Sequence, residues 1–242
     1  MIKGAEAIHM VRVLRMRPGD RMVLMDGKGR RFQAAVGEIG RHEVRALLEA
    51  RLPNPSPSPV EITLLQALIK SGPMDYLIQK TSELGADRLI PFEAIRSVVR
   101  PDETRLTKKL THWKKVAASA AKQSGRISPL VVESLSSLGD LLQCYEKAPA
   151  LKVIPWEGEE TMDLKRMLAT APRNGQFVGM IGPEGGFSNE EVGLAQAAGF
   201  IPVSLGWRIL RAETAAIAMT AIVQYAWGDL GRTCCQRAPS RS

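Results

Sequence analysis

The sequence predicts an α/β protein that begins with a small β-rich domain, and three observations support this prediction. Short apolar runs separated by turn residues fill positions 1–52. Four prolines follow within 53–59, and neither a helix interior nor a central strand tolerates them. From residue 60 onward, apolar runs alternate with amphipathic stretches, as in a parallel sheet with crossover helices. We therefore predict domains at 1–52 and 60–231, a linker at 53–59 and a disordered tail at 232–242.

The first domain is expected to be a small basic sheet or barrel. Apolar residues at helical spacing predict a short helix over 5–14. Alternating residues between turn signals predict strands at 21–25, 31–36 and 43–48, with a hairpin turn at Asp26-Gly27-Lys28-Gly29.

The second domain is expected to alternate strands with helices along its whole length. A nearly continuous apolar run at 60–69 is typical of a buried parallel strand, and further strands are predicted at 88–92, 95–99, 130–133, 151–155, 177–181 and 201–205. Helices are predicted at 74–84, 104–124, 138–145, 162–169, from the capping box at Ser188 to the stop at Gly199, and at 212–230. The last helix is apolar nearly all round, so the sheet and a second subunit are expected to cover it.

Charge and composition favour a cytoplasmic protein with an acidic partner. The net charge is +8, and one basic block, 100–126, holds eight Lys or Arg against two acids. Such blocks suit phosphate backbones, although a solvated basic face is the simpler alternative. The sequence has neither an apolar run long enough to span a membrane nor a signal-peptide pattern. Its three cysteines fit neither a disulfide framework nor a metal site, and Cys234-Cys235 lie in the predicted tail.

Two Gly-rich turns near the C-terminus are the strongest candidates for a binding site. Gly182-Pro183-Glu184-Gly185-Gly186 and Leu205-Gly206-Trp207-Arg208 each follow a predicted strand and precede a predicted helix. Glycine lets a ligand approach the backbone closely, and helix N-termini favour polar groups. Neither turn has the spacing of a dinucleotide or P-loop motif, and a tight turn without a ligand stays an alternative.

The charged residues beside these turns have alternative interpretations. Glu184 suits a hydrogen bond from a ribose or amine, or a helix dipole. Arg208 and Arg211 suit a phosphate or base edge, or an ion pair with Glu213 or Glu184. No other catalytic pattern is convincing, because the three histidines are scattered and the Ser/His/Asp, HExxH and CxxC patterns are absent. A metal site is therefore not expected.

Both turns and several other segments of the sequence resemble those of a known family. The segments IGPEGGFS and SLGWRILRAETA resemble the C-terminal signature of the small-subunit ribosomal RNA uridine-N3 methyltransferases, the RsmE family of the SPOUT class. Further matches occur at His9 with 13–15, at 78–80 with 83–85, and at Trp113 with 121–124 and Arg126. The resemblance implies a PUA-like β-barrel followed by a SPOUT-type α/β domain with a C-terminal trefoil knot. It also implies a homodimer through the knot region, with no membrane association.

The family's functional residues carry over onto matching positions. S-adenosyl-L-methionine would bind the backbone of the two turns at Ile181, Gly182, Gly185, Gly186, Leu205, Gly206, Ile209 and Leu210, with Pro155 as a third wall. From their place on the two turns, Arg211 is expected to stabilise charge on the uracil or fix its phosphate, and Glu184 is expected to accept its proton or to contact the cofactor. Ribosomal RNA of the small subunit would be contacted by Arg12, Arg15, Lys114, Lys122, Arg126 and Arg208.

Two departures and two alternatives accompany this resemblance. Only eight residues precede His9, where the family has an extra strand, and Ser119 stands where an acid is expected. A SPOUT enzyme with another RNA target or another methylated atom is one alternative. A non-catalytic RNA-binding protein of ribosome assembly is the other.

Overall fold

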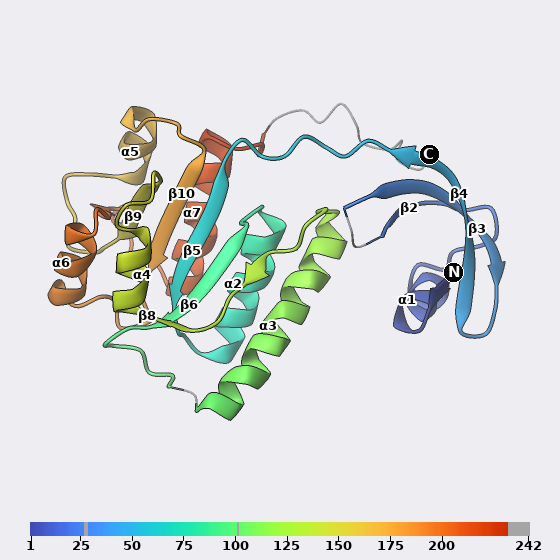
Figure 1. Cartoon of the computed structure of the whole chain (residues 1–242), viewed down its shortest axis with the longest axis horizontal. Helices are drawn as coiled ribbons and strands as arrows, with labels where there is room; N and C mark the ends of the chain where they lie inside the picture. Colours follow the sequence, from blue (N-terminus) through green and yellow to red (C-terminus); the bar gives the residue numbers. More distant parts are fainter. Residues whose placement is uncertain (27–28, 101, 232–242) are drawn as a thin grey trace. The chain divides into compact units, whose positions relative to one another are not determined.

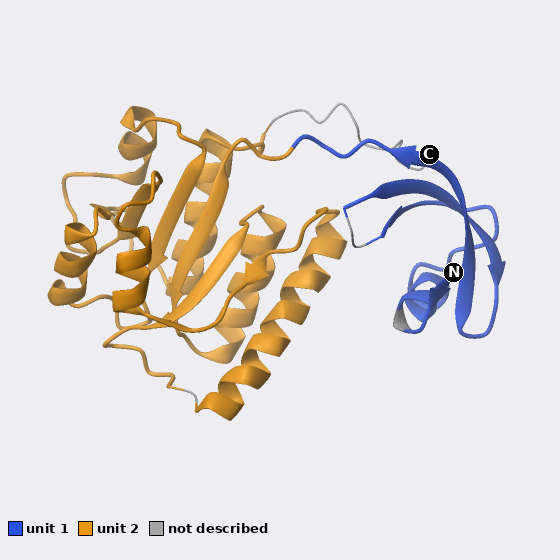
Figure 2. Cartoon of the chain, in the orientation of Figure 1, with its two compact units in different colours: residues 1–56 blue, residues 57–242 orange. Residues whose placement is uncertain are grey.

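The computed structural model describes residues 1–26, 29–100 and 102–231, and it divides into two compact units (Figure 2). Unit 1 is Met1–Ser56 and unit 2 is Pro57–Ser242. Two positions of the predicted hairpin turn, 27 and 28, and the predicted tail at 232–242 lie outside the described residues. No described helix is long and apolar enough to cross a membrane.

Unit 1 is a four-stranded antiparallel sheet covered on one side by a short helix. Its strands are β1 Ile2–Lys3, β2 Arg21–Met25, β3 Arg31–Ile39 and β4 Glu43–Leu52, in the order β1-β4-β3-β2. The predicted helix over 5–14 is divided into α1 Ala5–Ile8 and a π-helical turn, η1 His9–Val13. Ala7 and Met10 from these turns pack against Val36 and Val44 of the sheet. Among the described residues, no pairing of β1 with β2 closes this sheet into a barrel.

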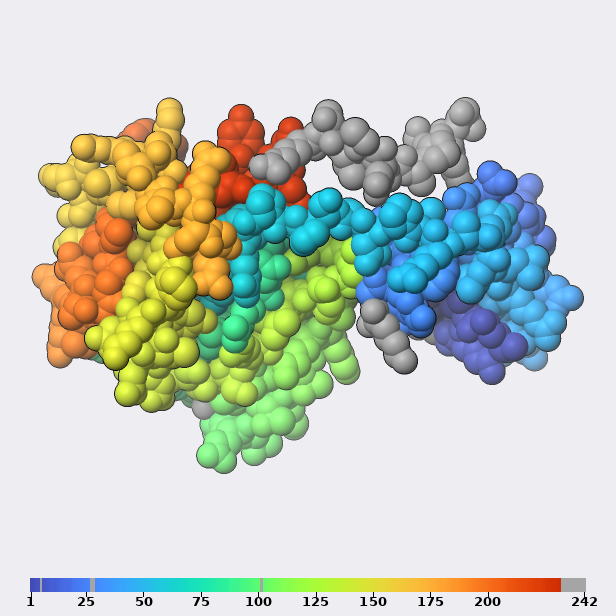
Figure 3. All heavy atoms as spheres, turned by 45° about the horizontal axis from the view of Figure 1, so that its top comes forward, coloured from blue at the N-terminus to red at the C-terminus, as the bar shows by residue number. Residues whose placement is uncertain are grey.

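Unit 2 contains a parallel sheet with helices on both faces (Figure 1). Its strands are β5 Glu61–Ala67, β6 Arg88–Glu93, β7 Val131–Val132, β8 Ser136–Ser137, β9 Leu151–Pro155, β10 Gln176–Ile181 and β11 Ile201–Val203. The order is β11-β9-β10-β5-β6-β7, and β8 pairs with β6. β5 and β10 are parallel neighbours, with Ile62 in register with Phe177. The space-filling view (Figure 3) shows the cyan and orange parts of the chain meeting at the surface.

The alternation of side chains along the strands builds one apolar layer on each face of the sheet. Ile62 and Leu64 pack with α2 Ser71–Glu83, α3 Glu103–Ser124, α5 Leu164–Thr170 and α7 Ala212–Ala226. Leu65 and Ala67 face the other layer, which contains α4 Leu138–Tyr145 and α6 Asn189–Ala197. This α/β architecture with a β-rich first unit is the predicted fold class.

Three predicted elements of unit 2 need correction. The expected strand at 95–99 is a turn, because the Ser97 N–H donates to the Ala94 carbonyl and Glu191 accepts the Ile95 N–H. α2 begins at Ser71 and not after Gly72-Pro73, since proline is tolerated in the first turn of a helix. The last helix ends at Ala226, four residues early.

Candidate functional site

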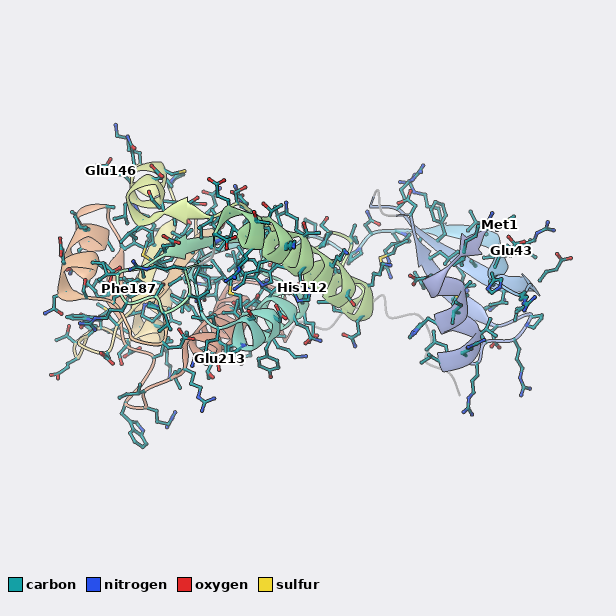
Figure 4. The ribbon with its side chains drawn as sticks, turned by 90° about the horizontal axis from the view of Figure 1, so that it is seen from below. Met1, Glu43, His112, Glu146, Phe187 and Glu213 are labelled. Atoms are coloured by element: carbon teal, nitrogen blue, oxygen red, sulfur yellow. The ribbon has the colours of Figure 1, made fainter. Side chains whose placement is uncertain are left out.

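The carboxyl ends of the parallel strands meet at one edge of the sheet, and the loops that leave β9, β10 and β11 surround a cleft there. The cleft has a volume of about 890 Å³, which is within the roughly 300–1,000 Å³ of small-molecule sites. Such a crevice at the carboxyl edge is where open α/β sheets bind ligands. Figure 4 views the molecule from below this edge, with Phe187 of the first turn and Glu213 of α7 labelled.

The turn after β10 brings bare backbone to the cleft. The Gly186 N–H donates to the Pro183 carbonyl at 3.0 Å, and Gly186 has a φ of 67°, which favours glycine. A Cβ on Gly182 would lie 3.1 Å from the ring of Phe187. That ring in turn stacks on Phe92 of β6, with centroids 6.4 Å apart. A side chain at 182 would therefore require the Phe187 ring to shift by a few tenths of an ångström.

A buried carboxylate locks this turn to the loop that follows β6. Glu191 is 1% exposed, and its two oxygens accept the N–H groups of Ser188, at 2.9 Å, and Ile95, at 2.8 Å. Ser188 completes the predicted capping box with α6. Arg96 of the same loop donates to the Gly185 carbonyl at 3.1 Å, so the turn is held from outside the cleft.

The loop between β11 and α7 forms the opposite wall. Ser204 anchors it, because its N–H donates to the Met162 carbonyl at 2.8 Å and its hydroxyl accepts the Gly206 N–H at 3.2 Å. Gly206 has a φ of 104° and turns the chain there. Beyond it, Trp207 and Ile209 are both 88% exposed, and Arg211 is the N-cap residue of α7.

The cleft has more negative than positive side chains. Five carboxylates and three cationic side chains line it: Glu157, Glu159, Glu160, Glu184 and Glu213, with Lys70, Arg208 and Arg211. Hydrogen bonds from the Thr161 hydroxyl and from the N–H groups of Met162 and Thr161 lower the pKa of the Glu159 carboxyl. This surplus of negative charge suits a ligand that carries positive charge.

Neither arginine of the cleft is neutralised by an acid in the part of the chain that the structure describes. Arg208 lies over the Trp207 ring, with its guanidinium carbon 5.2 Å from the ring centroid. Glu184 accepts the backbone N–H of Lys70 at 3.0 Å, at the N-terminus of α2. The ion pairs considered from the sequence, with Glu213 or Glu184, are therefore not formed.

Most of the predicted cofactor residues come together in this cleft. Its lining includes both predicted catalytic residues, Arg211 and Glu184, and eight predicted cofactor residues: Pro155, Ile181, Gly182, Gly186, Leu205, Gly206, Ile209 and Leu210. Gly185 is not in the lining, and its backbone faces Arg96 instead.

The predicted RNA contacts are dispersed. Arg12 and Arg15 are exposed in unit 1, Lys114 and Lys122 are exposed on α3, and Arg208 lies at the cleft.

Arg126 differs from the others, because its guanidinium is directed into the protein. It donates to the carbonyls of Ser82, at 2.8 Å, and Ala86, at 2.6 Å, and pairs with Asp87 at 3.3 Å. Burial raises the pKa of the Asp87 carboxyl, although the Ile62 N–H and Arg126 both favour its charged form. With its donors used in this way, Arg126 ties α2 to the end of α3 and is not placed for a phosphate.

Sequence reasoning missed several residues of the cleft. Trp156 and Glu157 enter it because β9 lies beside β11, where the Trp156 N–H donates to the Val203 carbonyl at 3.1 Å. The order of strands is not readable from the sequence. Trp207, in contrast, lies within a predicted turn. The large aromatic side chain in a Gly-rich segment was the feature of the sequence that could have identified it as a binding residue.

Comparison with known proteins identifies the two domains of the chain. A family model described as an RNA methyltransferase domain matches residues 56–224, and one described as an RNA methyltransferase PUA domain matches residues 2–49. Ribosomal RNA small subunit methyltransferase E of Mycobacterium bovis is 34% identical over 225 residues, which are 92% of this chain and 85% of that protein. The Bacillus subtilis protein of the same name is 30% identical over 227 residues, 93% and 89% of the two chains.

A solved structure shows the same fold. The crystal structure of a ribosomal RNA small subunit methyltransferase E from Neisseria gonorrhoeae, bound to S-adenosyl methionine, matches with a TM-score of 0.79. Its sequence identity is 33%, and the match covers 93% of this chain and 90% of that one. The fold and the matched domains thus define an RNA methyltransferase with an N-terminal PUA domain. Within that class, the chain belongs to the ribosomal RNA small subunit methyltransferase E family.

Proposed function

We propose that this protein is an S-adenosylmethionine-dependent enzyme that methylates N3 of a uridine in small-subunit ribosomal RNA. One observation carries the proposal: the two Gly turns, which α6 and β11 separate in the sequence, line one acid-rich cleft together with Arg211. The related Neisseria protein binds S-adenosyl methionine, and the names of the relatives supply the RNA substrate. The choice of N3 of uridine rests on the family resemblance.

The residues of the cleft fit the cofactor. S-adenosylmethionine has a positive sulfonium and ammonium beside one carboxylate, which suits the surplus of carboxylates in the lining. The backbone of Ile181, Gly182, Gly186 and Leu205 would hold its polar groups, and Ile209 and Leu210 would cover its apolar parts. When bound, the cofactor supplies an electrophilic methyl group.

The protein's own part in the reaction is to prepare the uracil. N3 carries a weakly acidic proton and becomes nucleophilic only when that proton leaves. Arg211 is assigned to stabilise the negative charge that then spreads over the base, because its guanidinium lines the cleft and forms no ion pair with a described residue. Glu184 is assigned as proton acceptor: the Lys70 N–H binds its Oε1 and leaves Oε2 without a described partner. Positioning and electrostatics supply most of the acceleration in such a transfer.

The assignment is tested by incubating small-subunit ribosomal RNA, and separately the small-subunit particle, with labelled S-adenosylmethionine and digesting the product to nucleosides. We expect label in 3-methyluridine, and a loss of about 100-fold or more in kcat for Arg211→Ala. Arg173→Ala, an exposed arginine before β10, is the matched control and should retain full activity. Label in another nucleoside would refute the N3 assignment. If the wild-type chain neither transferred the methyl group nor bound the cofactor, the proposal that this protein is an S-adenosylmethionine-dependent enzyme would be refuted.

RNA binding is assigned to the exposed basic residues of both units. Arg12 and Arg15 in unit 1, and Lys114 and Lys122 on α3 of unit 2, would each bind RNA phosphates. This arrangement predicts that the affinity falls steeply with salt. The target base would leave its stack to reach the cleft.

A homodimer through α7 is also part of the proposal. α7 buries one face, yet its other face leaves Ile222 39% and Tyr225 75% exposed in the isolated chain. These residues lie three apart on the helix, on one side with Ala218 and Ala221. A second copy would cover this stripe.

The trefoil knot is proposed from family membership. β10 lies between β5 and β9, and the chain then passes through α6 on one face and α7 on the other. Knots are very rare in proteins, so an experimental structure in which 150–226 traces an open path would refute it.

A further inference from the structure

Trp207 is the most conspicuous side chain at the mouth of the cleft. It is 88% exposed, whereas Trp113 and Trp227 are 1% and 5% exposed in the core. The sequence contains only four tryptophans, and two of them, Trp156 and Trp207, line this one cleft. An indole left in water beside a binding site indicates a contact that forms only when a partner arrives.

The surroundings of Trp207 hold the indole at the cleft and give it a positive charge. The hydrogen bonds of Ser204 and the left-handed Gly206 fix the backbone just before it. The Arg208 guanidinium lies over its ring, a stacked arrangement that is favourable between a cation and an indole. Four residues further along, Arg211 is the N-cap residue of α7 and also lines the cleft.

We propose that the Trp207 indole, ordered by Arg208, is the stacking platform that holds the RNA base to be methylated at the mouth of the cleft. This inference rests on the proposed function and names the residue that receives the substrate. Every base offers a flat face to an aromatic ring, and such a stack changes RNA affinity by about 5- to 150-fold. The cationic neighbours suit the phosphate of the same nucleotide and the charge that develops on the base.

Other occupants of the indole fit the geometry less well. The adenine of the cofactor is also flat, but the half-buried Trp156, against which Gly158 packs, is the more enclosed of the two rings. A second copy of the chain would be expected to cover Trp207 with apolar residues, and apolar residues do not pair with the arginines beside it. RNA carries the opposite charge to these arginines. A nucleotide satisfies both the ring and the cations.

The experiment compares Trp207→Phe, Trp207→Leu and Trp207→Ala in the full-length chain. We measure KM and kcat for RNA methylation, the Kd for S-adenosylmethionine by calorimetry, and the oligomeric state by sedimentation. Stacking predicts that Phe stays within about three-fold of the wild-type KM, whereas Leu and Ala raise it by at least ten-fold. The Kd for the cofactor and the oligomeric state should not change. Tyr76→Ala is the matched control, because Tyr76 also lies beneath a cation, Lys80, but outside this cleft.

A second measurement identifies the base. Once the methylated nucleotide is mapped, RNA with an abasic site at that position is bound to wild type and to Trp207→Ala. If Trp207 stacks on that base, the loss caused by the abasic site disappears in the variant, whereas additive losses would overturn the assignment.

Three further results would also overturn it: an unchanged KM in Trp207→Ala, a weaker cofactor Kd with normal RNA binding, or dissociation into monomers. Failure of the proposed function is distinguished because the wild-type chain would then transfer no methyl group.

Discussion

Replacement of Glu191 by glutamine tests whether a buried carboxylate outside the cleft holds the turn after β10 against the loop that follows β6. Glu191 accepts two backbone N–H groups, one from Ser188 and one from Ile95, and it is almost fully buried. Glutamine keeps one acceptor oxygen, which suffices for the capping box. Its amide group then faces the Ile95 N–H, so one donor is left without an acceptor.

The magnitude follows from this single lost hydrogen bond. A buried donor without a partner costs about 1–3 kcal/mol. With a central value of about 2 kcal/mol, and about 2–4 °C per kcal/mol for a domain of this size, Tm should fall by about 4–8 °C. The assay is thermal unfolding followed by circular dichroism, together with hydrogen exchange of the Ile95 amide, which should become faster.

Glu190→Gln is the matched control, because this neighbouring side chain is exposed and no described residue pairs with it. It should change stability by less than about 0.5 kcal/mol. Equal Tm values for the two variants would show that Glu191 does not hold the β6 loop. A fall in Tm with normal exchange at Ile95 would show that the wrong hydrogen bond had been assigned.

Four further predictions follow. Lys152→Met removes the donor to three helix-end carbonyls, of Tyr145, Glu146 and Ala198, and should cost about 2–4 kcal/mol in a urea titration; a loss under 1 kcal/mol would contradict this. Burial raises the folded-state pKa of Asp87, so the contribution of this group to stability is present below about pH 4 and is lost as pH rises through the folded-state pKa. The unfolding midpoint of Asp87→Asn should lack this dependence on pH. Wild-type and variant midpoints that change with pH in parallel would disprove the prediction. Ile222→Glu should convert a dimer to monomers in sedimentation, whereas a dimer that persists would exclude α7 as the interface. Lys114→Glu should weaken RNA binding and reduce its dependence on salt concentration, and an unchanged salt slope would remove this lysine from the RNA surface.

The two Gly turns show which structural features short-range sequence patterns predict correctly. Ser188 and Glu191 stand at capping-box spacing, so the start of α6 was predicted, and the capping hydrogen bonds confirm it. Glycines between a strand and a helix predicted close backbone approach, and Gly182 and Gly206 do line the cleft. These features depend on residues a few positions apart, whose geometry the backbone itself restricts.

The predictions fail where contacts with segments distant in the sequence determine the local structure. Residues 95–99 have the apolar, β-branched composition of a strand, but Glu191 from α6 takes the Ile95 N–H and keeps the segment in a turn. Arg126 belongs to a basic block, yet α2 and Asp87 surround its guanidinium. Composition reports that a residue is charged, whereas burial decides what its charge contacts.

The sequence by itself determined the fold class, most of the helices and strands, and the two turns, because periodicity and turn chemistry are local properties of the chain. Only the tertiary structure decided that β9 lies beside β11 and so brings Trp156 and Glu157 to the turns. It also decided that Trp207 stays in solvent and that Gly185 faces Arg96 and not the cleft. Strand order and burial depend on packing between segments far apart in the chain, and no short-range pattern encodes them.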